Sequence, residues 1–379
     1  MSVWVVVGGQ YGSEGKGKVA AAITIREEID ICVRCGGPNS GHCFVDDSGE
    51  LRALRQIPTG YVRPGTRLLI PSGGLIDLQV LKQELDSLRL GPDRVGVDRR
   101  TMVIEPLDRS REAELGLRNR LSSTLCGVGS AVSRRALRSE DVRLAADAAI
   151  EAAWLRPYLV DAAAEINDGV DRGKKVLVEG TQGFGLSLYH SEVYPKTTSR
   201  DTSAAGCLSE CGISPRLVTD IVLVLRTFPI RVAGQQAGPM FEEIDWETVQ
   251  RESGYPTPLA EFTTVTGKLR RVARFDFDLA RRAAEVNRPT VLAVNFLDYL
   301  DYGNRGAAGP SSFTEATRAF IRNLELRLGV EVGFAGIGPA LSETMTIRED
   351  RSHVTDRYVA RRDEMQTAQG REESISHAI

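Results

Sequence analysis

The sequence predicts an α/β fold in which a large, central, mostly parallel sheet is flanked by helices. Short apolar runs of strand length recur along the chain, and amphipathic stretches of helical length separate them. A glycine-rich loop, GGQYGSEG at residues 8–15, connects the first apolar run to a helix. Apolar strands of this kind are typically buried on both faces of a parallel sheet. In such sheets, ligands bind at the carboxyl ends of the strands.

The expected elements follow one another in this order. The strands are WVVVGG, IDICVR, RLLIPSG, KKVLVEG, DIVLVLRTF and TVLAVNF. The helices are the segment from Gly15 to about Glu28, the stretch RLAADAAIEAAWLRPYLVDAAAEI, and FTEATRAFIRNLELRLG. Residues 1–350 are expected to form one domain, and the polar residues 351–379 are expected to form a solvated helix or tail.

The composition is that of an ordinary soluble chain. It has 379 residues, 42% hydrophobic content and a net charge of −3. The basic residues are dispersed, so no nucleic-acid partner is expected, and no apolar run has membrane-spanning length. The first residues do not resemble a secretory signal, which favours a cytoplasmic protein. Cys32 and Cys35 form a CxxC inside a strand-like run without a second CxxC, so we expect structural thiols rather than a zinc site.

The glycine-rich loop is suited to an anion, because it leaves a buried strand and opens a helix. It departs from the Walker pattern. Five residues separate Gly9 from Gly15 and Lys16, and Gly17 stands where that pattern has a magnesium-binding hydroxyl. An ordinary P-loop kinase is therefore disfavoured. The alternative, a glycine-rich turn without a ligand, carries a cost in backbone entropy that nothing would offset.

GQYGSEGKGK resembles the GQWGDEGKGK signature of adenylosuccinate synthetases. GGPNSGHCF, at residues 36–44, resembles that family's GGxNAGHT. Further matches follow in the family's order over nearly the whole chain: STLCGVGSA, VSRRALR, EGTQGFGLSLYHSEVYPKTTSRDTSAAG, TTVTGKLRR, FLDYLD and GIGPALSETM. The resemblance implies a magnesium-dependent ligase. A nucleoside triphosphate phosphorylates the purine 6-oxygen, and aspartate then displaces that phosphate.

The resemblance also implies roles for individual residues. Lys16 would stabilise the transferring phosphoryl group, and His42 would donate a hydrogen bond or proton to the 6-oxygen and γ-phosphate. Gln182 would meet the purine edge, and the Gly41 carbonyl would help to ligate Mg²⁺. The remaining loop residues expected at the triphosphate are Gly12, Glu14, Gly15 and Gly17.

The acceptor's 5′-monophosphate would be bound by Asn39, Thr124 and Thr198. In relatives an arginine reaches this phosphate from the partner subunit. Aligning VSRRALR with the family's VARRGLR assigns that role to Arg134 rather than Arg135. The resemblance therefore implies a homodimer with composite sites.

The loop from Val265 to Arg271 resembles the family's aspartate-binding TTGRRRR. Its candidates for the two carboxylates of L-aspartate are Thr266, Lys268 and Arg270. Val265 replaces a threonine, and Lys268 replaces an arginine that lies near the acceptor ribose in relatives. At these two positions the resemblance therefore does not fix the aspartate geometry or the ribose preference.

The donor base is read in the family by a lysine-leucine-aspartate triplet, which here is Phe296, Leu297 and Asp298. Toward the C-terminus, beside Gly338 and Pro339, Gly336 and Leu341 stand in place of a serine and an arginine. The more apolar pocket predicts ATP or dATP as donor. The alternative is that Asp298 alone still selects guanine.

Ser13 stands where adenylosuccinate synthetases have an aspartate that takes the purine N1 proton and ligates Mg²⁺. A serine is a poor base at neutral pH, but its short side chain leaves room for a 2-amino group. This departure resembles the phage branch of the family, the 2-amino-2′-deoxyadenylosuccinate synthases. These act on dGMP, can use adenine nucleotides as donor, and lead to diaminopurine DNA. By this resemblance Ser13 remains a catalytic and magnesium-site candidate, and the protein would work in a phage-infected host's cytoplasm.

The predicted function is thus ligation of L-aspartate to the 6-position of dGMP with ATP or dATP, giving N6-succino-2-amino-2′-deoxyadenylate. Three alternatives remain: a conventional IMP-aspartate ligase, a nucleotide-binding regulator without ligase activity, and a single-step nucleotide kinase. The N1 proton also has two possible routes, through Ser13 and a water or to the transferring phosphate.

Overall fold

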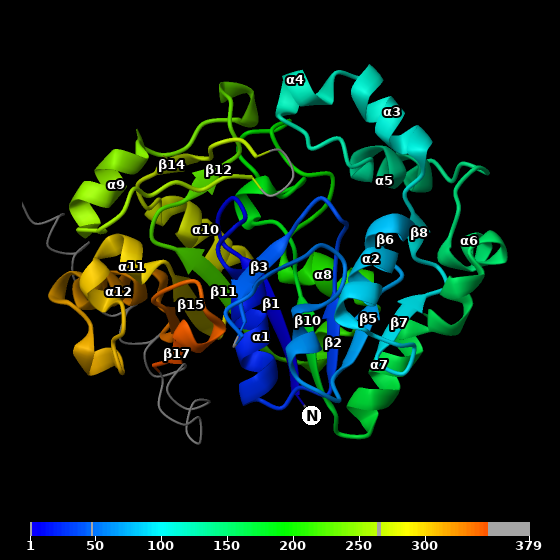
Figure 1. Ribbon diagram of the computed structural model, residues 1–379, viewed down its shortest axis with the longest axis horizontal. Coiled ribbons are helices and arrows are strands. Elements are labelled where there is room, and N and C mark those ends of the chain that lie inside the picture. The colour runs from blue at the N-terminus through cyan, green and yellow to red at the C-terminus, as the bar shows by residue number, and fades with distance from the viewer. Residues whose placement is uncertain (1, 47, 264–266, 348–379) are drawn as a thin grey trace, which may run out of the picture. The chain divides into compact units, whose positions relative to one another are not determined.

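A ten-stranded sheet forms the centre of the structure (Figure 1). The computed structural model describes residues 2–46, 48–263 and 267–347, and residues 1–347 form one compact unit. Val265, Thr266 and the expected tail at 351–379 lie outside the described residues. The sheet is parallel throughout except for its first edge strand, which pairs antiparallel with its neighbour.

The strands follow this order across the sheet: β17 (Thr344–Thr346), β16 (Val332–Gly336), β15 (Val291–Asn295), β11 (Val218–Arg226), β1 (Ser2–Gly8), β10 (Lys175–Glu179), β2 (Ile31–Arg34), β5 (Arg67–Ile70), β7 (Val95–Asp98) and β9 (Leu159–Val160). Three smaller sheets are formed by β3 (His42–Val45) with β4 (Leu51–Leu54), by β6 (Leu75–Ile76) with β8 (Met102–Val103), and by β12 (Ile230–Arg231), β14 (Arg271–Ala273) and β13 (Glu243–Ile244).

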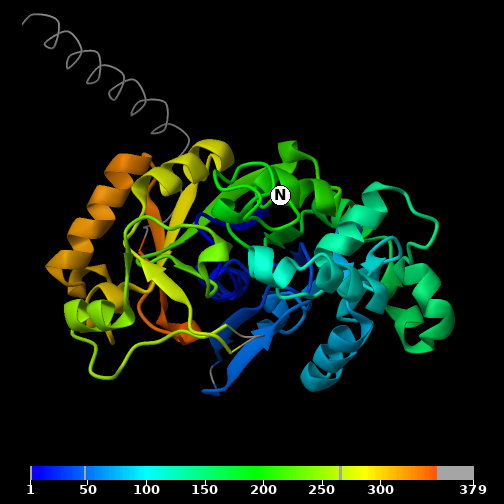
Figure 2. The same cartoon turned by 90° about the horizontal axis from the view of Figure 1, so that it is seen from above.

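The helices are α1 (Lys16–Arg26), α2 (Leu78–Leu88), α3 (Pro106–Glu114), α4 (Leu117–Leu121), α5 (Val128–Ala136), α6 (Ala145–Glu151), α7 (Ala162–Asp171), α8 (Ala204–Cys211), α9 (Trp246–Ser253), α10 (Phe277–Asn287), α11 (Leu297–Leu300) and α12 (Glu315–Leu328). Short 3₁₀ turns are η1 (Thr59–Val62), η2 (Ala153–Tyr158), η3 (Phe184–Leu186), η4 (Pro215–Leu217), η5 (Gln235–Ala237), η6 (Tyr302–Asn304), η7 (Pro310–Ser312) and η8 (Leu341–Glu343). From above, α3 to α6 and α9 with β14 lie on opposite sides of β1 (Figure 2).

The hydrophobic core lies on both faces of the sheet. Successive side chains of β1 point alternately to one face and the other. Val5 and its neighbours two residues away pack with α7, α8, α10 and α12, whereas Trp4 and Val6 pack with α1, α2 and α6. Both faces are covered, which explains why the strands are almost continuously apolar. Because β1, β2, β10, β11 and β15 are parallel, their carboxyl ends meet at one edge.

The six predicted strands are confirmed, and so are α1 and α12. The prediction of one long helix over residues 143–166 is wrong. That stretch contains α6, η2, β9 and the start of α7. Pro157 lies within η2 and has no N–H to continue a helix, and Leu159 and Val160 instead form the outermost strand. Among the helices of the described ranges, none is long and apolar enough to cross a membrane.

Candidate active site

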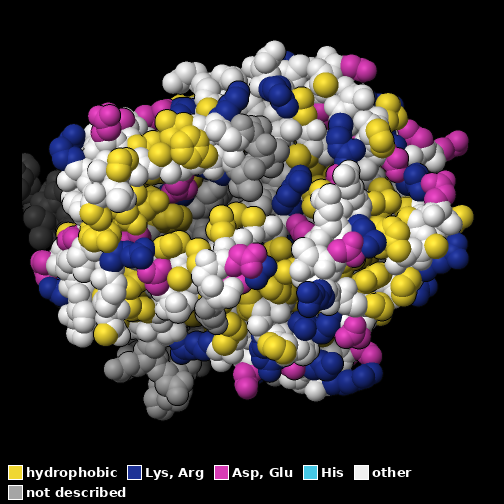
Figure 3. Space-filling model, viewed as in Figure 1, with side chains coloured by type: hydrophobic (Ala, Val, Ile, Leu, Met, Phe, Trp, Pro, Cys, Tyr) yellow, Lys and Arg dark blue, Asp and Glu magenta, His cyan; other side chains and the backbone are white. Residues whose placement is uncertain are grey.

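A cavity of about 940 Å³ opens at the carboxyl ends of the central strands. Most of the predicted site residues line it: Gly12, Ser13, Gly15, Lys16, Gly17, Asn39, Gly41, His42, Thr124, Gln182, Thr198, Lys268, Arg270 and Phe296. Basic and acidic side chains are interspersed over the face in Figure 3, rather than forming a basic stripe. The fold therefore brings together residues that are distant in the sequence. Gly12 and Phe296, for example, are 284 positions apart.

The glycine-rich loop is held in shape by its own carboxylate. Glu14 is fully buried and accepts hydrogen bonds from the amides of Gln10 and Gly12, at 3.1 and 2.8 Å. Its other oxygen accepts from Lys16 Nζ at 2.6 Å. Gly15 precedes α1 with φ of 87°, in the left-handed region that favours glycine. In this form Glu14 neutralises the charge of Lys16.

Gly17 lies where the Walker pattern has a hydroxyl, and the packing explains why it is glycine. A Cβ built on Gly17 would lie 2.5 Å from the Cβ of His42, so any side chain here would displace the histidine. The absence of a hydroxyl-bearing side chain at position 17 is therefore required by the position of His42.

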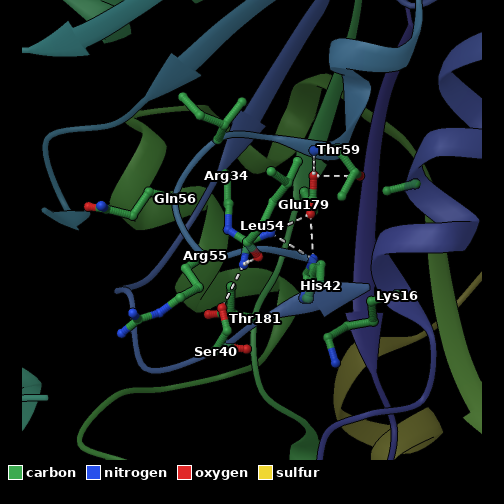
Figure 4. A network of polar contacts seen from close by, with 12 residues as sticks. Lys16, Arg34, Ser40, His42, Leu54, Arg55, Gln56, Thr59, Glu179 and Thr181 are labelled. Atoms are coloured by element: carbon green, nitrogen blue, oxygen red, sulfur yellow. Dashed lines mark hydrogen bonds and ion pairs between the residues drawn. The ribbon is translucent and has the colours of Figure 1, made fainter. Parts of the chain in front are cut away.

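His42 belongs to a buried polar network between β2, β3 and β10 (Figure 4). Its Nδ1 contacts Glu179 Oε1, and Arg34 Nη1 donates to the same oxygen at 2.7 Å. The other oxygen of Glu179 accepts from the amide and hydroxyl of Thr59, at 2.7 and 2.9 Å. Lys16 lies beyond His42 on the side away from Glu179 (Figure 4).

Burial and the nearby Arg34 charge lower the pKa of His42 to about 4. Burial alone would raise the pKa of Glu179, but Arg34 and His42 hold it below its usual value. At neutral pH the network therefore contains a neutral imidazole and a carboxylate. The imidazole Nε2 is buried and has no hydrogen-bond partner within the described ranges. An unsatisfied buried nitrogen of this kind points to a ligand.

Ser13 is exposed in the cavity with φ of 57°. Its carbonyl accepts from Arg226 Nη1 at 2.9 Å, and that guanidinium also pairs with Glu261 and lies 3.9 Å from the centre of the Phe296 ring. The fully buried Arg226 thus connects the glycine-rich loop with Glu261 and Phe296. The Ser13 side chain presents a small hydroxyl to the cavity.

The cavity's acidic lining residues are Glu112 and Glu261. Glu112 accepts from the amides of Gly127 and Gly129, at 2.9 and 2.8 Å, and Glu261 pairs with Arg226. Both carboxylates are therefore engaged. Across the described residues, no uncommitted carboxylate lines the cavity beside Ser13.

Arg134, which is predicted to reach the acceptor phosphate of the partner subunit, forms an ion pair within its own chain. Its guanidinium is buried in its own chain, donating to both oxygens of Asp108 at 2.8 and 2.9 Å and to the Asp141 carbonyl at 2.9 Å. A buried, bidentate ion pair keeps this side chain away from the cavity, where it is not a lining residue. The ion pair with Asp108 thus fixes the side chain within the single subunit, and the role of Arg134 across a dimer interface stays a prediction.

Replacing Asp108 with alanine is expected to lower the free energy of unfolding by about 3–5 kcal/mol, because it leaves a buried guanidinium without its carboxylate. Asp141 provides the matched control. Its side chain is half exposed and lies 3.2 Å from Arg134, so Asp141→Ala should cost less than about 1 kcal/mol. Urea unfolding of both variants measures the difference, and equal losses would contradict this account of Arg134.

The aspartate-loop candidates lie at the cavity's edge. Lys268 and Arg270 line the cavity, whereas Thr266 lies outside the described residues. The Arg270 amide donates to the Glu261 carbonyl at 2.8 Å, and Trp246 Nε1 donates to the Arg270 carbonyl at 2.8 Å. Hydrogen bonds thus link the backbone of this loop to Trp246 of α9 and to Glu261, which pairs with Arg226.

Among the donor-base candidates, Phe296 directly precedes α11 and Asp298 lies in its first turn. Of Phe296, Asp298, Gly338 and Pro339, Phe296 lines the cavity. Asp298 is buried, its Oδ1 has no hydrogen-bond partner within the described ranges, and burial raises its pKa to about 6. The Gly338 carbonyl accepts from Lys18 Nζ at 2.5 Å, and the Pro339 carbonyl accepts from the Val45 amide at 3.1 Å. Asp298 therefore presents a buried acceptor near an aromatic ring.

Sequence reasoning missed four polar residues that organise the site. Each is the last residue of an apolar strand: Arg34 of β2, Glu179 of β10, Arg226 of β11 and Asn295 of β15. Asn295 donates to the Glu14 carbonyl at 2.7 Å. The signal was a single polar residue at the carboxyl end of each buried parallel strand.

Comparison with known proteins gives consistent results. A model of the adenylosuccinate synthetase family matches residues 5–153 and 143–305. Adenylosuccinate synthetases of Thermococcus onnurineus and Pyrococcus horikoshii are each 40% identical, covering 92% and 91% of this chain and 99% and 98% of theirs.

Two solved structures are also similar. One is the succinoaminodeoxyadenylate synthetase of cyanophage S-2L, bound to dGMP and to dATP as an energy donor. It is 28% identical, has a TM-score of 0.77, and the match covers 92% of this chain and 96% of that one. Fully ligated adenylosuccinate synthetase from Plasmodium falciparum has a TM-score of 0.79 at 18% identity, over 92% of this chain and 100% of that one, and shares the fold.

Proposed function

The chain belongs to the adenylosuccinate synthetase family, and we propose that within this family it joins L-aspartate to the 6-position of dGMP. It is a C–N ligase of the type that uses a purine nucleotide, aspartate and a nucleoside triphosphate. The proposed product is N6-succino-2-amino-2′-deoxyadenylate, a precursor of diaminopurine nucleotides.

The observation that carries the proposal is the hydroxyl of Ser13 in a cavity whose lining carboxylates are engaged elsewhere. An aspartate at position 13 would place a carboxylate beside purine positions 1 and 2. A serine leaves that space to a 2-amino group, which dGMP has and IMP lacks. The similarity to a cyanophage enzyme bound to dGMP supports the same acceptor.

The proposed chemistry begins by converting the 6-oxygen into a leaving group. Lys16 leaves Glu14 to bind the γ-phosphate, and the loop amides bind its oxygens. His42 acts at the 6-oxygen and γ-phosphate, while Gln182 orients the purine. The acceptor phosphate is bound by Asn39, Thr124 and Thr198, and Arg134 is proposed to reach it across the interface of a homodimer.

The second step requires aspartate to reach the same carbon. We assign its carboxylates to Lys268, Arg270 and, by resemblance, Thr266. We also propose a homodimer, which light scattering of the purified protein tests directly.

The residues present fit a magnesium ion held mainly by the triphosphate. Mg²⁺ keeps several waters and takes one or two protein oxygens together with phosphates. The Ser13 hydroxyl and the Gly41 carbonyl, which the resemblance assigns to the ion, belong to residues that line the cavity. When bound, the ion would neutralise charge on the transferring phosphoryl group.

The proposed donor is ATP or dATP. Phe296, with Arg226 on its ring, replaces the lysine that relatives present to guanine. The buried Oδ1 of Asp298 favours a base with an N–H group, which both adenine and guanine have. Initial rates with ATP, dATP and GTP decide between them, and a preference for GTP would contradict the assignment.

A second candidate function is conventional IMP-aspartate ligation. It is favoured by the archaeal adenylosuccinate synthetases, which are 40% identical to this chain, compared with 28% for the cyanophage enzyme. A regulator without activity is disfavoured, because Lys16, His42 and Gln182 all line the cavity.

The reaction class is tested by inorganic phosphate release from purified protein with Mg²⁺, ATP and a purine monophosphate. Release that requires aspartate is expected, together with a product whose mass exceeds that of the monophosphate by one aspartate less one water. Phosphate transfer without aspartate would indicate a kinase, and no turnover with dGMP or IMP would indicate a regulator.

A further inference from the structure

We propose that Arg118 is a binding residue for the 5′-monophosphate of the acceptor nucleotide, in the same subunit as Thr124 and Thr198. This inference rests on the proposed function for the identity of the ligand. Because dGMP and IMP both carry this phosphate, it does not depend on which of them is the acceptor.

The proposed phosphate site has no cation from its own subunit. Asn39, Thr124 and Thr198 offer an amide and two hydroxyls, all of them neutral. A phosphate monoester carries a charge of about −1.5 to −2 at neutral pH. Within one subunit Arg134 is paired with Asp108, so its charge is already balanced. A cation on this side of the cavity would therefore stabilise the bound phosphate.

Most of the cations that line the cavity are already committed. Six lysine and arginine side chains of the described ranges line it. Lys16 pairs with an acid of its own loop, and the side chains of Lys196 and Arg231 donate to backbone carbonyls. Lys268 and Arg270 belong to the segment assigned to aspartate. One cation remains.

The remaining cation is Arg118, which lies in α4 and lines the cavity. This arginine is exposed, and no described residue forms a hydrogen bond or ion pair with its guanidinium. Glu112, an acidic lining residue that precedes α4, accepts from the amides of Gly127 and Gly129 instead. The guanidinium is therefore available to an anion, and its paired N–H groups match two oxygens of a phosphate.

The backbone places Arg118 and Thr124 on one tight turn. After α4 the chain reverses at Ser122, whose φ of 57° is in the left-handed region and whose amide donates to the Arg118 carbonyl at 3.1 Å. The Ser123 amide then donates to the Leu117 carbonyl at 3.2 Å. Thr124 follows directly, so it leaves the turn beside the helix that carries Arg118.

The segment that contains Thr198 is attached to the same helix. Lys196 Nζ donates to the Arg120 carbonyl at 2.9 Å, and Lys196 is two residues from Thr198. Arg118, Thr124 and Thr198 all line the cavity. They therefore belong to one hydrogen-bonded part of its wall.

Two other anions are proposed to share this cavity, the triphosphate of the donor and the carboxylates of aspartate. The triphosphate is assigned to Lys16 and the loop at the carboxyl end of β1, and aspartate to the segment with Lys268 and Arg270. Arg118 shares its turn with Thr124 instead, which favours the phosphate of the acceptor.

The test compares Arg118→Gln with Arg120→Gln, two residues further along the same helix. Arg120 is also exposed, but it is not among the described residues that line the cavity. Its Nη1 donates to the Leu115 carbonyl at 3.4 Å, and its own carbonyl, which binds Lys196, is unchanged by the substitution. The control therefore removes an equal charge from the same helix outside the cavity. Because both arginines are exposed, both variants should fold.

Isothermal titration calorimetry of the purified proteins gives the Kd for dGMP, IMP and ATP, each titrated alone. Arg118→Gln is expected to raise the Kd for dGMP and for IMP by about 10–100-fold, because the phosphate loses a charged hydrogen-bond donor. The Kd for ATP should change less than about threefold, and Arg120→Gln should leave all three values within about threefold.

Steady-state kinetics add a second measurement. In Arg118→Gln the KM for the monophosphate should rise, while kcat and the KM for aspartate stay within a factor of about three. Arg118→Lys keeps the charge but not the paired N–H groups, so it should recover part of the lost affinity.

Equal changes of Kd in Arg118→Gln and Arg120→Gln would overturn the proposal, and so would a loss confined to ATP or to aspartate. If the unmodified protein binds dGMP or IMP without turning either over, the proposed ligase function fails alone, and the Kd comparison still decides the role of Arg118. If the unmodified protein binds neither monophosphate, both proposals are overturned.

Discussion

His42→Asn is expected to lower kcat by about 10²–10⁴-fold, the range contributed by a general acid or base. The asparagine amide can occupy the position of Nδ1 and donate to Glu179, so the buried network keeps its partner. What is lost is Nε2, the buried nitrogen that has no partner in the described part of the chain. Steady-state phosphate release at saturating substrates measures the effect.

His190→Asn provides the control. His190 is about one third exposed and stacks on Phe184 at 5.7 Å between ring centres, outside the cavity lining. Its replacement should leave kcat within a few-fold. If His42→Asn retained similar activity, His42 would have only a packing role against Gly17.

Ser13→Asp is expected to reverse the choice of acceptor. A carboxylate at this position would occupy the space next to the 2-amino group and would provide a base for N1. We therefore expect turnover of dGMP to fall, and that of IMP to rise, by about 10²-fold or more each. Because aspartate tolerates the left-handed backbone at φ of 57°, the substitution should not strain the loop.

Ser13→Gly distinguishes the space that Ser13 leaves for the 2-amino group from a chemical role of its hydroxyl. Glycine also accepts this backbone conformation and leaves even more room, so it should retain the preference for dGMP. The ratio of kcat/KM for dGMP to that for IMP is the quantity to compare among the three proteins. A ratio that position 13 does not change would show that selection of the 2-amino group lies elsewhere.

The central strands were predictable because each is buried on both faces of the sheet. Such a strand is a continuous apolar run, which can be recognised in the local sequence. The structure of residues 143–166 was not predictable in this way. The apolar periodicity continues through Pro157, but the helical backbone does not. The two-residue strand β9 pairs with β7, which is distant in sequence, and a local sequence pattern does not indicate that pairing.

The motif residues of the site were predictable by resemblance, but their partners were not. Arg34 and Glu179 are 145 positions apart and meet because β2 and β10 are neighbours in the sheet. The motif gives the position of Arg134 but not the acid that faces it. Asp108, 26 positions away, determines the conformation of that arginine here.

The measurement that tests the central claim most directly is phosphate release by the unmodified protein with Mg²⁺, ATP and aspartate, offering dGMP in one reaction and IMP in the other. Turnover with dGMP and little with IMP is expected, because Ser13 makes room for the 2-amino group. Efficient turnover with IMP and none with dGMP would contradict the account and identify the protein as a conventional adenylosuccinate synthetase.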